Sequence, residues 1–379
     1  MTKRHDVAIV GGGLVGLFSA LYLARQGASV VVFEAGDPGA EASGANAGSL
    51  HLQIQYPEFV KFGENWARAY APTLRFLAGS IELWKGMSDD LGEDLAVSTK
   101  GGIVVAKTDA QMRAIESKSR IEAEFGVETR VLGQSDLQRL APYLSKKMIG
   151  GGFCADEGKA DTLRATPALL NAVRTAGVDI HTHTPVKDIT VESGGFHLAT
   201  TNGAFRATQV VNAAGAKAAQ IASMVGVSVG LEGFPLQVTV GEPCAPIIPH
   251  LIYSAAGKLT LKQAPNGGLI VGGGWAAQVR EGGGLATNPV NFAANMALAA
   301  EVVPAVASAR TVRSWTAWVN GTADWRPVIG EAQGVPGFYL ALFPWVGFSA
   351  APMTGRVVAD LVAARDLTVP LKGISVLYD

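Results

Sequence analysis

The sequence predicts an α/β chain, α+β overall, in which a Rossmann-like domain is joined to a mainly antiparallel β-sheet domain. The first observation is a short apolar run at residues 7–10, leucines at helical spacing over residues 14–24 and a β-branched run at residues 29–34. That order of strand, helix and strand is typical of a βαβ unit on a parallel sheet. The second observation is the strand-like stretch at residues 234–318, with alternating polar and apolar residues at 258–262.

The periodicity of apolar residues supports the other elements in chain order. Helices are expected at residues 58–87, 109–125, 135–140 (opened by Ser135), 161–176, 291–303 and 353–364. Strands are expected at residues 101–106, 178–180, 185–189, 196–200, 207–215, 269–271 and 337–342. Residues 332–355 carry no charge, but prolines interrupt them, so they are interpreted as buried strand, loop and helix start rather than a membrane span.

The composition excludes several classes of function. The 31 basic and 32 acidic residues give a net charge of -1, so no nucleic-acid partner is expected. Cys154 and Cys244 lie in unrelated contexts and predict neither a disulfide framework nor a metal site. Residues 1–6 form a short polar lead into the first strand, so the expectation is a cytoplasmic protein without a signal peptide or transmembrane segment.

A glycine-rich turn follows the first strand. Gly11, Gly13 and Gly16 are spaced as Gly-x-Gly-x-x-Gly, which permits a tight turn, close approach of a pyrophosphate and close packing of the next helix. Glu34 ends the second strand, where a carboxylate accepts hydrogen bonds from ribose hydroxyls and disfavours a 2′-phosphate. The combination predicts a site for FAD or NAD rather than NADP.

Two further segments favour FAD. Residues 42–50 form a loop of small residues, which lets main-chain groups contact a flat polar ligand, although taken alone it is better interpreted as an ordinary flexible loop. Residues 210–215 are a strand that ends in a small-residue turn and resembles a second contact for FAD. The βαβ-like pattern recurs at the start, middle and end of the chain. We therefore expect a discontinuous FAD-binding domain, with the following boundaries: residues 1–85, 150–225 and 320–379 for FAD, and residues 86–149 and 226–319 for the substrate.

Taken together, these segments resemble the D-amino-acid-oxidase superfamily of flavoproteins, which includes glycine oxidase, the sarcosine oxidases and D-amino-acid dehydrogenases. The resemblance also rests on the helix at residues 161–177 and on the block at residues 347–355. It implies that Gly347, Phe348 and Ser349 present backbone groups to the flavin pyrimidine, near the dipole of the last helix. The full set of implied cofactor contacts is Gly11, Gly13, Leu14, Val15, Gly16, Glu34, Ala35, Ser43, Gly44, Asn46, Ala47, Gly48, Ser49, Leu50, Val186, Ala213, Ala214, Gly215, Gly347, Phe348 and Ser349.

The chain departs from this superfamily at the expected amine pocket. Val319 stands where relatives commonly carry an arginine that binds the substrate carboxylate, and Arg326 lies seven residues later. Leu342-Phe343 replaces the usual Gly-His before the final glycine. Residues 49–53 resemble instead the flavin subunits of opine (octopine or nopaline) oxidases and of hydrogen cyanide synthase, which work in heteromeric dehydrogenases.

Five residues are candidates for the amine pocket. His51 is the first, because its ordinary pKa near neutrality suits acceptance of the amine proton, and a structural histidine is the alternative. Trp345 and Phe343 either wall the pocket or belong to the core. Arg326 either binds a carboxylate or forms an ion pair, and Tyr253 is a weaker candidate on a strand of the substrate domain, as is Lys262.

The resemblance implies FAD-dependent oxidation of a C–N bond, with hydride transfer from an amino acid or an opine-type secondary amine to flavin N5 and hydrolysis of the imine. The expected context is a flavin subunit of a heteromeric dehydrogenase whose partner subunits carry further redox centres, which could bring the chain to the membrane periphery. Two alternatives stay open: a stand-alone D-amino-acid or glycine-type oxidase or dehydrogenase, and a non-catalytic FAD-binding scaffold.

Overall fold

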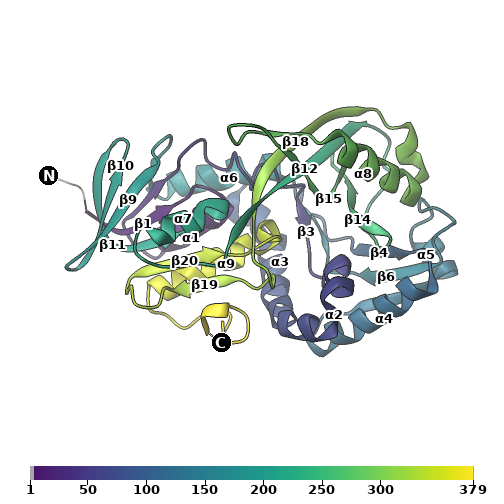
Figure 1. The fold of residues 1–379 in the computed structure, drawn as a ribbon, viewed down its shortest axis with the longest axis horizontal. Coiled ribbons are helices and arrows are strands. Elements are labelled where there is room, and N and C mark those ends of the chain that lie inside the picture. The colour runs from purple at the N-terminus through teal and green to yellow at the C-terminus, as the bar shows by residue number, and fades with distance from the viewer. Residues whose placement is uncertain (1–3, 379) are drawn as a thin grey trace.

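The structure is a computed structural model that describes residues 4–378. Figure 1 shows an elongated molecule in which one sheet with its helices occupies each half. The first sheet has eight strands in the order β19-β20-β11-β1-β2-β8, and the hairpin β9-β10 continues from β11. Its strands are β1 (Arg4–Val10), β2 (Val30–Phe33), β8 (Asp179–His181), β9 (Val186–Glu192), β10 (Gly195–Thr200), β11 (Gly203–Asn212), β19 (Val328–Glu331) and β20 (Phe338–Leu342).

Strand β1 is buried on both faces. Val7 and Ile9 belong to the core that contains α1 and α9, whereas Ala8 and Val10 pack in the cluster on the opposite face, which includes α7. β1 pairs in parallel with β2 and with β11. Because both faces of the strand are covered, its residues must be apolar throughout rather than alternately polar and apolar. This explains the continuous apolar run at the start of the chain.

The second sheet has eight strands in the order β18-β12-β15-β14-β13-β4-β6-β5. Its β13–β4 pair is parallel, and the remaining neighbours in this order pair antiparallel. The mixed α/β fold class is therefore confirmed. The strands are β4 (Gly102–Ala106), β5 (Thr129–Gly133), β6 (Gly150–Cys154), β12 (Glu232–Pro243), β13 (Leu251–Ser254), β14 (Gly257–Gln263), β15 (Gly268–Ala276) and β18 (Thr311–Gly321).

Helices cover both sheets, and short elements connect them (Figure 1). The helices are α1 (Leu14–Arg25), α2 (Tyr56–Tyr70), α3 (Pro72–Leu91), α4 (Asp109–Glu124), α5 (Gln134–Leu140), α6 (Thr162–Thr175), α7 (Ala218–Ser223), α8 (Pro289–Val302) and α9 (Gly347–Val362). The short strands are β3 (Ser49–Leu50), β7 (Gly158–Lys159), β16 (Gln278–Val279) and β17 (Leu285–Ala286), and the 3-10 turns are η1 (Gly215–Lys217), η2 (Pro304–Ser308) and η3 (Val376–Tyr378).

Three helix boundaries differ from the sequence prediction. The expected helix at residues 58–87 is two helices, because Pro72 opens α3 directly after α2. Ser135 is not an N-cap, since α5 begins one residue earlier after Gly133. The last helix begins at Gly347 rather than at residue 353 and contains Pro352. Proline lacks the N–H that would donate to Phe348 O, and the Trp84 indole N–H donates to that oxygen instead, at 3.2 Å.

The division of the chain into two domains stays a proposal. Pairing of β6 with β4 and β5 places residues 150–154 in the second sheet, although the sequence pattern groups residues 150–225 with FAD. We therefore propose that the second domain extends through β6. None of the helices in the described part of the chain has the length and apolar character needed to cross a membrane.

Candidate active site

The turn between β1 and α1 leaves no room for side chains. Gly11 has a φ of +110°, and a Cβ on it would lie 2.5 Å from Ala213 O. A Cβ on Gly16 would overlap the carbonyl oxygen of Gly11. Gly13 caps α1 without a side chain, so the first turn of this helix presents N–H groups, of which Leu14 N–H donates to Ser43 Oγ at 2.9 Å. The backbone geometry fits a pyrophosphate at this helix end.

Two further predicted nucleotide contacts, Glu34 and Ala213, lie beside that turn. Glu34 directly follows β2, and its two carboxylate oxygens accept N–H groups of Gly12 and Gly36, each at 2.8 Å. Each oxygen keeps a second lone pair for a ribose hydroxyl. Ala213 N donates to Val10 O at 2.9 Å, so the end of β11 lies beside the end of β1. The carboxyl ends of parallel strands form the edge at which α/β sheets bind nucleotides.

The small-residue loop is fixed to both halves of the molecule. Asn46 Oδ1 accepts the Gly48 N–H at 2.7 Å, and Gly48 has a φ of +77°. Trp315 of β18 donates its indole N–H to Ala45 O at 2.8 Å. The loop is therefore anchored to α1 through Ser43 and to the second sheet through Ala45, and its contact with a flat ligand stays a prediction.

The first turn of α9 is tied to strand β3. The Ser349 hydroxyl donates to Ser49 O at 3.0 Å and accepts the His51 N–H at 2.8 Å. Phe348 packs in the core, where its ring stacks on Trp84 with centroids 4.8 Å apart. Only the backbone of residues 347–349 is thus suited to face a ligand. That these groups, Val186 and Ala214 contact FAD stays a prediction.

A cavity of about 500 Å³ lies where the small-residue loop, the start of α2 and the second sheet meet. His51, Tyr253 and Trp345 line it, as the sequence suggested, and Val319 lies in its wall. Phe343 and Arg326 are absent from the described lining residues. Phe343 is a core residue against Phe76, with ring centroids 5.4 Å apart, so of the two interpretations of this phenylalanine the structure supports the core and not the pocket wall.

Arg326 lies beyond the cavity, in the turn after β18. Its backbone N–H donates to Asp324 Oδ1 at 3.1 Å and its carbonyl accepts the Thr322 hydroxyl at 3.1 Å. The neighbouring Trp325, not Arg326, is the residue of this turn that lines the cavity. A role for Arg326 in holding a substrate carboxylate is therefore not supported by its position.

Most of the aromatic wall of the cavity was not predicted from the sequence. Trp325 stacks on Trp345 with centroids 5.0 Å apart, and Phe234 of β12 lies 4.5 Å from Trp345. Both tryptophans have left-handed backbone, with φ of +70° and +61°. Strain of this kind in bulky residues is typical of functional sites. The available signal was a proline two residues after Trp325 and another directly before Trp345.

His51 is a neutral imidazole at the cavity wall. Its Nδ1 lies 2.8 Å from the Tyr253 hydroxyl. Burial, and secondly the nearby Lys262 ammonium, lowers the pKa of His51 to about 3. A base this weak accepts a hydrogen bond but holds a proton poorly, so the lowered pKa disfavours His51 as acceptor of the amine proton near neutral pH, and its role stays a prediction.

Lys262 lies behind the cavity wall. It is 1% exposed, and its Nζ donates to Ser49 Oγ at 2.5 Å. Burial, and secondly the charge of Lys159, lowers the pKa of Lys262 to about 7. The lysine is thus close to its titration point at neutral pH, next to the end of the predicted flavin loop.

A nucleotide-binding sheet edge, a glycine turn with an acidic neighbour and a cavity between two sheets together define a two-part dinucleotide-dependent oxidoreductase. Comparison with known proteins identifies the family. The family described as FAD dependent oxidoreductase (DAO) matches residues 6–361, and the chain belongs to it. The predicted cofactor, FAD, is confirmed.

Relatives match over nearly the whole chain. Glycine oxidase from Geobacillus kaustophilus is 28% identical, and the match covers 99% of this chain and 97% of the relative. A subunit of the opine oxidase from Agrobacterium tumefaciens is 28% identical over 96% of this chain and 94% of its own length. The crystal structure of the Geobacillus kaustophilus glycine oxidase superimposes with a TM-score of 0.86 at 27% identity, covering 99% of this chain and 98% of that one.

Proposed function

We propose that this chain oxidises the C–N bond of an amino acid or an opine-type secondary amine, as the flavin subunit of a heteromeric dehydrogenase. The observation that carries the proposal is the cavity between the two sheets, which brings His51, Tyr253 and the aromatic wall next to the flavin loop. Bound FAD supplies the hydride acceptor in this reaction. The protein's part is to orient the amine and to exclude water.

His51 orients the substrate nitrogen. A neutral imidazole accepts a hydrogen bond from an amine N–H and leaves the lone pair of that nitrogen free. The lone pair must be free because it forms the C=N bond as hydride leaves the adjacent carbon. Trp325, Trp345 and Phe234 supply an apolar wall that keeps water from the reacting carbon.

The cations of the cavity favour a substrate with a carboxylate away from the reacting carbon. Val319 occupies the position on β18 where an arginine was expected, so the cavity lacks that cation. Lys61 of α2 and Lys258 of β14 line the cavity instead. Glu58 lies near both lysines: burial raises its pKa, and the charges of Lys258 and Lys61 oppose that rise. An opine carries two carboxylates on a secondary amine and suits this arrangement better than glycine does.

The heteromeric context rests on the relatives. Two of them are named as subunits of larger enzymes: the beta subunit of sarcosine oxidase from Rhizobium meliloti, 29% identical, and the opine oxidase subunit from Agrobacterium tumefaciens. We infer that electrons from reduced FAD pass to a partner subunit with a further redox centre. The cytoplasmic location remains a prediction. The similarity to glycine oxidase supports a stand-alone oxidase as the second candidate.

Anaerobic reduction of the bound flavin tests the proposal. The purified holoprotein is mixed with octopine, nopaline, D-amino acids, glycine, sarcosine and proline, and flavin absorbance is followed. Fast bleaching by an opine is expected, and bleaching only by glycine would favour the glycine-oxidase alternative. If no amine bleaches the flavin, the chain is a scaffold and the proposed activity is wrong. Full turnover of the isolated chain with dioxygen would contradict the heteromeric context.

A further inference from the structure

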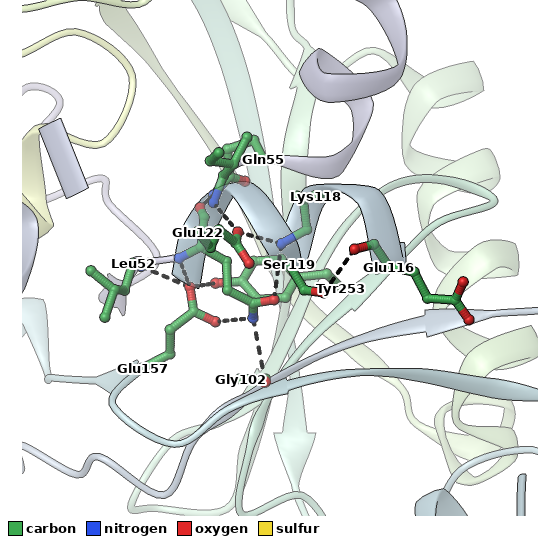
Figure 2. A network of polar contacts seen from close by, with 11 residues as sticks. Leu52, Gln55, Gly102, Glu116, Lys118, Ser119, Glu122, Glu157 and Tyr253 are labelled. Carbon is green, nitrogen blue, oxygen red and sulfur yellow. Dashed lines mark hydrogen bonds and ion pairs between the residues drawn. The ribbon is translucent and has the colours of Figure 1, made fainter. Parts of the chain in front are cut away.

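Glu157 is a buried carboxylate behind the cavity, and it is fully shielded from solvent. It lies between β6 and β7, and its Oε1 accepts the N–H groups of Leu52 at 2.7 Å and of Gln53 at 2.9 Å. The Gln53 side-chain amide donates to Oε2 at 2.8 Å. Figure 2 shows these bonds converging on the carboxylate, with Tyr253 in the same network.

The direction of the next hydrogen bond follows from these donors. Backbone N–H groups can only donate, so Oε1 of Glu157 is an acceptor. The Tyr253 hydroxyl, 3.1 Å from that oxygen, therefore donates its one proton to Glu157. The Tyr253 oxygen can then only accept from His51 Nδ1, at 2.8 Å. His51 must carry its proton on Nδ1, which leaves the lone pair on Nε2.

We propose that Glu157 is a positioning residue that fixes His51, through Tyr253, in the Nδ1–H tautomer, so that Nε2 accepts the hydrogen bond of the substrate amine. The inference rests on the proposed function for the role of His51. The opposite tautomer would place an N–H against the amine lone pair and tie up the electrons that form the C=N bond. Hydrogen bonding at one imidazole nitrogen commonly sets the tautomer at the other.

The acceptor role of Glu157 Oε1 follows from its two backbone N–H donors and does not depend on whether Glu157 is ionised. Burial raises the pKa of Glu157, and the N–H groups of Leu52 and Gln53 and the charge of Lys118 oppose that rise. Lys118 of α4 forms a buried ion pair with Glu122 at 2.5 Å (Figure 2). Its ammonium also contacts Gln53 Oε1 at 3.2 Å. The other groups that face His51 are Lys262 from β14 and the Ser349 hydroxyl from α9.

The tautomer can be measured directly by 15N NMR of the FAD-bound full chain labelled at its six histidines. His51→Gln assigns the His51 signals. We expect an Nδ1–H, Nε2-unprotonated imidazole in the wild-type protein. An Nε2–H imidazole would overturn the proposal outright. This readout needs no substrate, so it fails or succeeds independently of the proposed activity.

Variants then test whether Glu157 is the cause. Glu157→Ala removes the acceptor of Tyr253, and we expect His51 to change to the Nε2–H form and flavin reduction to slow by about 10–100-fold, mainly in kcat. Glu157→Gln keeps an amide oxygen that can accept from Leu52, Gln53 and Tyr253, so the tautomer should be retained. Its NH2 group replaces Oε2 opposite the Gln53 amide donor, so the rate should fall, but less than in Glu157→Ala. The side chain in Glu157→Asp is one methylene shorter, so its carboxylate can still accept from the backbone but falls short of Tyr253. This variant replaces Glu157→Ala if the alanine variant does not fold.

A matched control comes from a second tyrosine–histidine pair. The Tyr143 hydroxyl lies 2.6 Å from His250 Nδ1, and neither residue is among the described lining of the cavity. Tyr253→Phe should change the His51 signals and slow flavin reduction, whereas Tyr143→Phe should change only those of His250. Retention of the Nδ1–H form of His51 in Tyr253→Phe, or in both the alanine and aspartate variants at Glu157, would overturn the proposal.

Discussion

At the nucleotide end of the site the main chain forms the surface, whereas at the amine end side chains from distant segments do. The glycine turn and the ends of β2 and β11 depend on the absence of Cβ atoms and on strand order. The amine end depends on His51, Tyr253 and Glu157, which are separated by about 100–200 positions along the chain and meet through hydrogen bonds. We therefore expect the nucleotide end to be sensitive to any added side-chain volume and the amine end to be sensitive to the loss of a hydrogen-bonding or ion-pairing partner.

The glycine turn provides the largest expected effect. Gly16→Ala would place a methyl group against the carbonyl oxygen of Gly11 and push α1 away from β1, so no stoichiometric FAD should copurify. Gly86→Ala is the matched control, since its Cβ would meet nothing within 4 Å. That variant should keep FAD and gain roughly 0.5–1 kcal/mol of stability, because alanine favours the helix. The flavin-to-protein absorbance ratio measures the FAD content of each variant, and thermal unfolding measures its stability. Retention of FAD in Gly16→Ala would contradict a site formed by the main chain.

The buried polar network provides the next largest effect. Lys118→Met leaves Glu122 buried without its cation, and we expect the free energy of unfolding to fall by about 3–5 kcal/mol. Arg25→Met breaks an exposed pair with Asp90, in which the side chains are 40% and 41% exposed, and should cost at most about 1 kcal/mol. Denaturant unfolding of the holoproteins compares the two. Equal costs would show that the network at the amine end is not specially sensitive to loss of a partner.

The same contrast explains what could be predicted from the sequence. The nucleotide end is formed by short segments of the chain in which the backbone geometry dictates the residue types. Gly11, Gly13 and Glu34 can therefore be identified in the sequence without knowledge of the fold. The α/β class and the mainly antiparallel second sheet follow equally from local periodicity. The helix start at Gly347 was missed because a proline within a helix argues locally against it, whereas the Trp84 N–H that bonds to the freed Phe348 carbonyl comes from a distant segment.

The amine end could be predicted only in part. His51 was found because it follows the flavin loop in the chain, but its depressed pKa comes from burial and from Lys262, which is more than 200 positions away. Glu157 gave no local signal, since a carboxylate between two short strands is ordinary until its donors are known. The place of Phe343 stayed open because an aromatic residue near a site is indistinguishable in sequence from one in the core.

A pH titration sharpens the comparison at Lys262. Its pKa is lowered to about 7 in the folded chain, against an ordinary value of 10.5. Between these values the unfolded chain binds the extra proton, so stability rises with pH from about 7 to 10, by at most about 1.4 kcal/mol per pH unit. Lys262→Met should be more stable than wild type at pH 7 and should lose most of this slope. Denaturant unfolding at several pH values measures it, and an unchanged slope would contradict a buried, half-titrated lysine.

The smallest effect is expected at the cavity mouth, where side chains are partly exposed. Lys258→Met removes one of the two cations proposed to meet a distal carboxylate, and we expect KM for an opine to rise about 3–10-fold with kcat unchanged, because an exposed ion pair contributes at most about 1 kcal/mol. Lys100→Met, outside the described cavity lining, is the control. A substrate amide without the carboxylate should be insensitive to Lys258→Met. If kcat fell instead, Lys258 would act at the reacting carbon, and the separation between an orienting histidine and a distal carboxylate site would have to be abandoned.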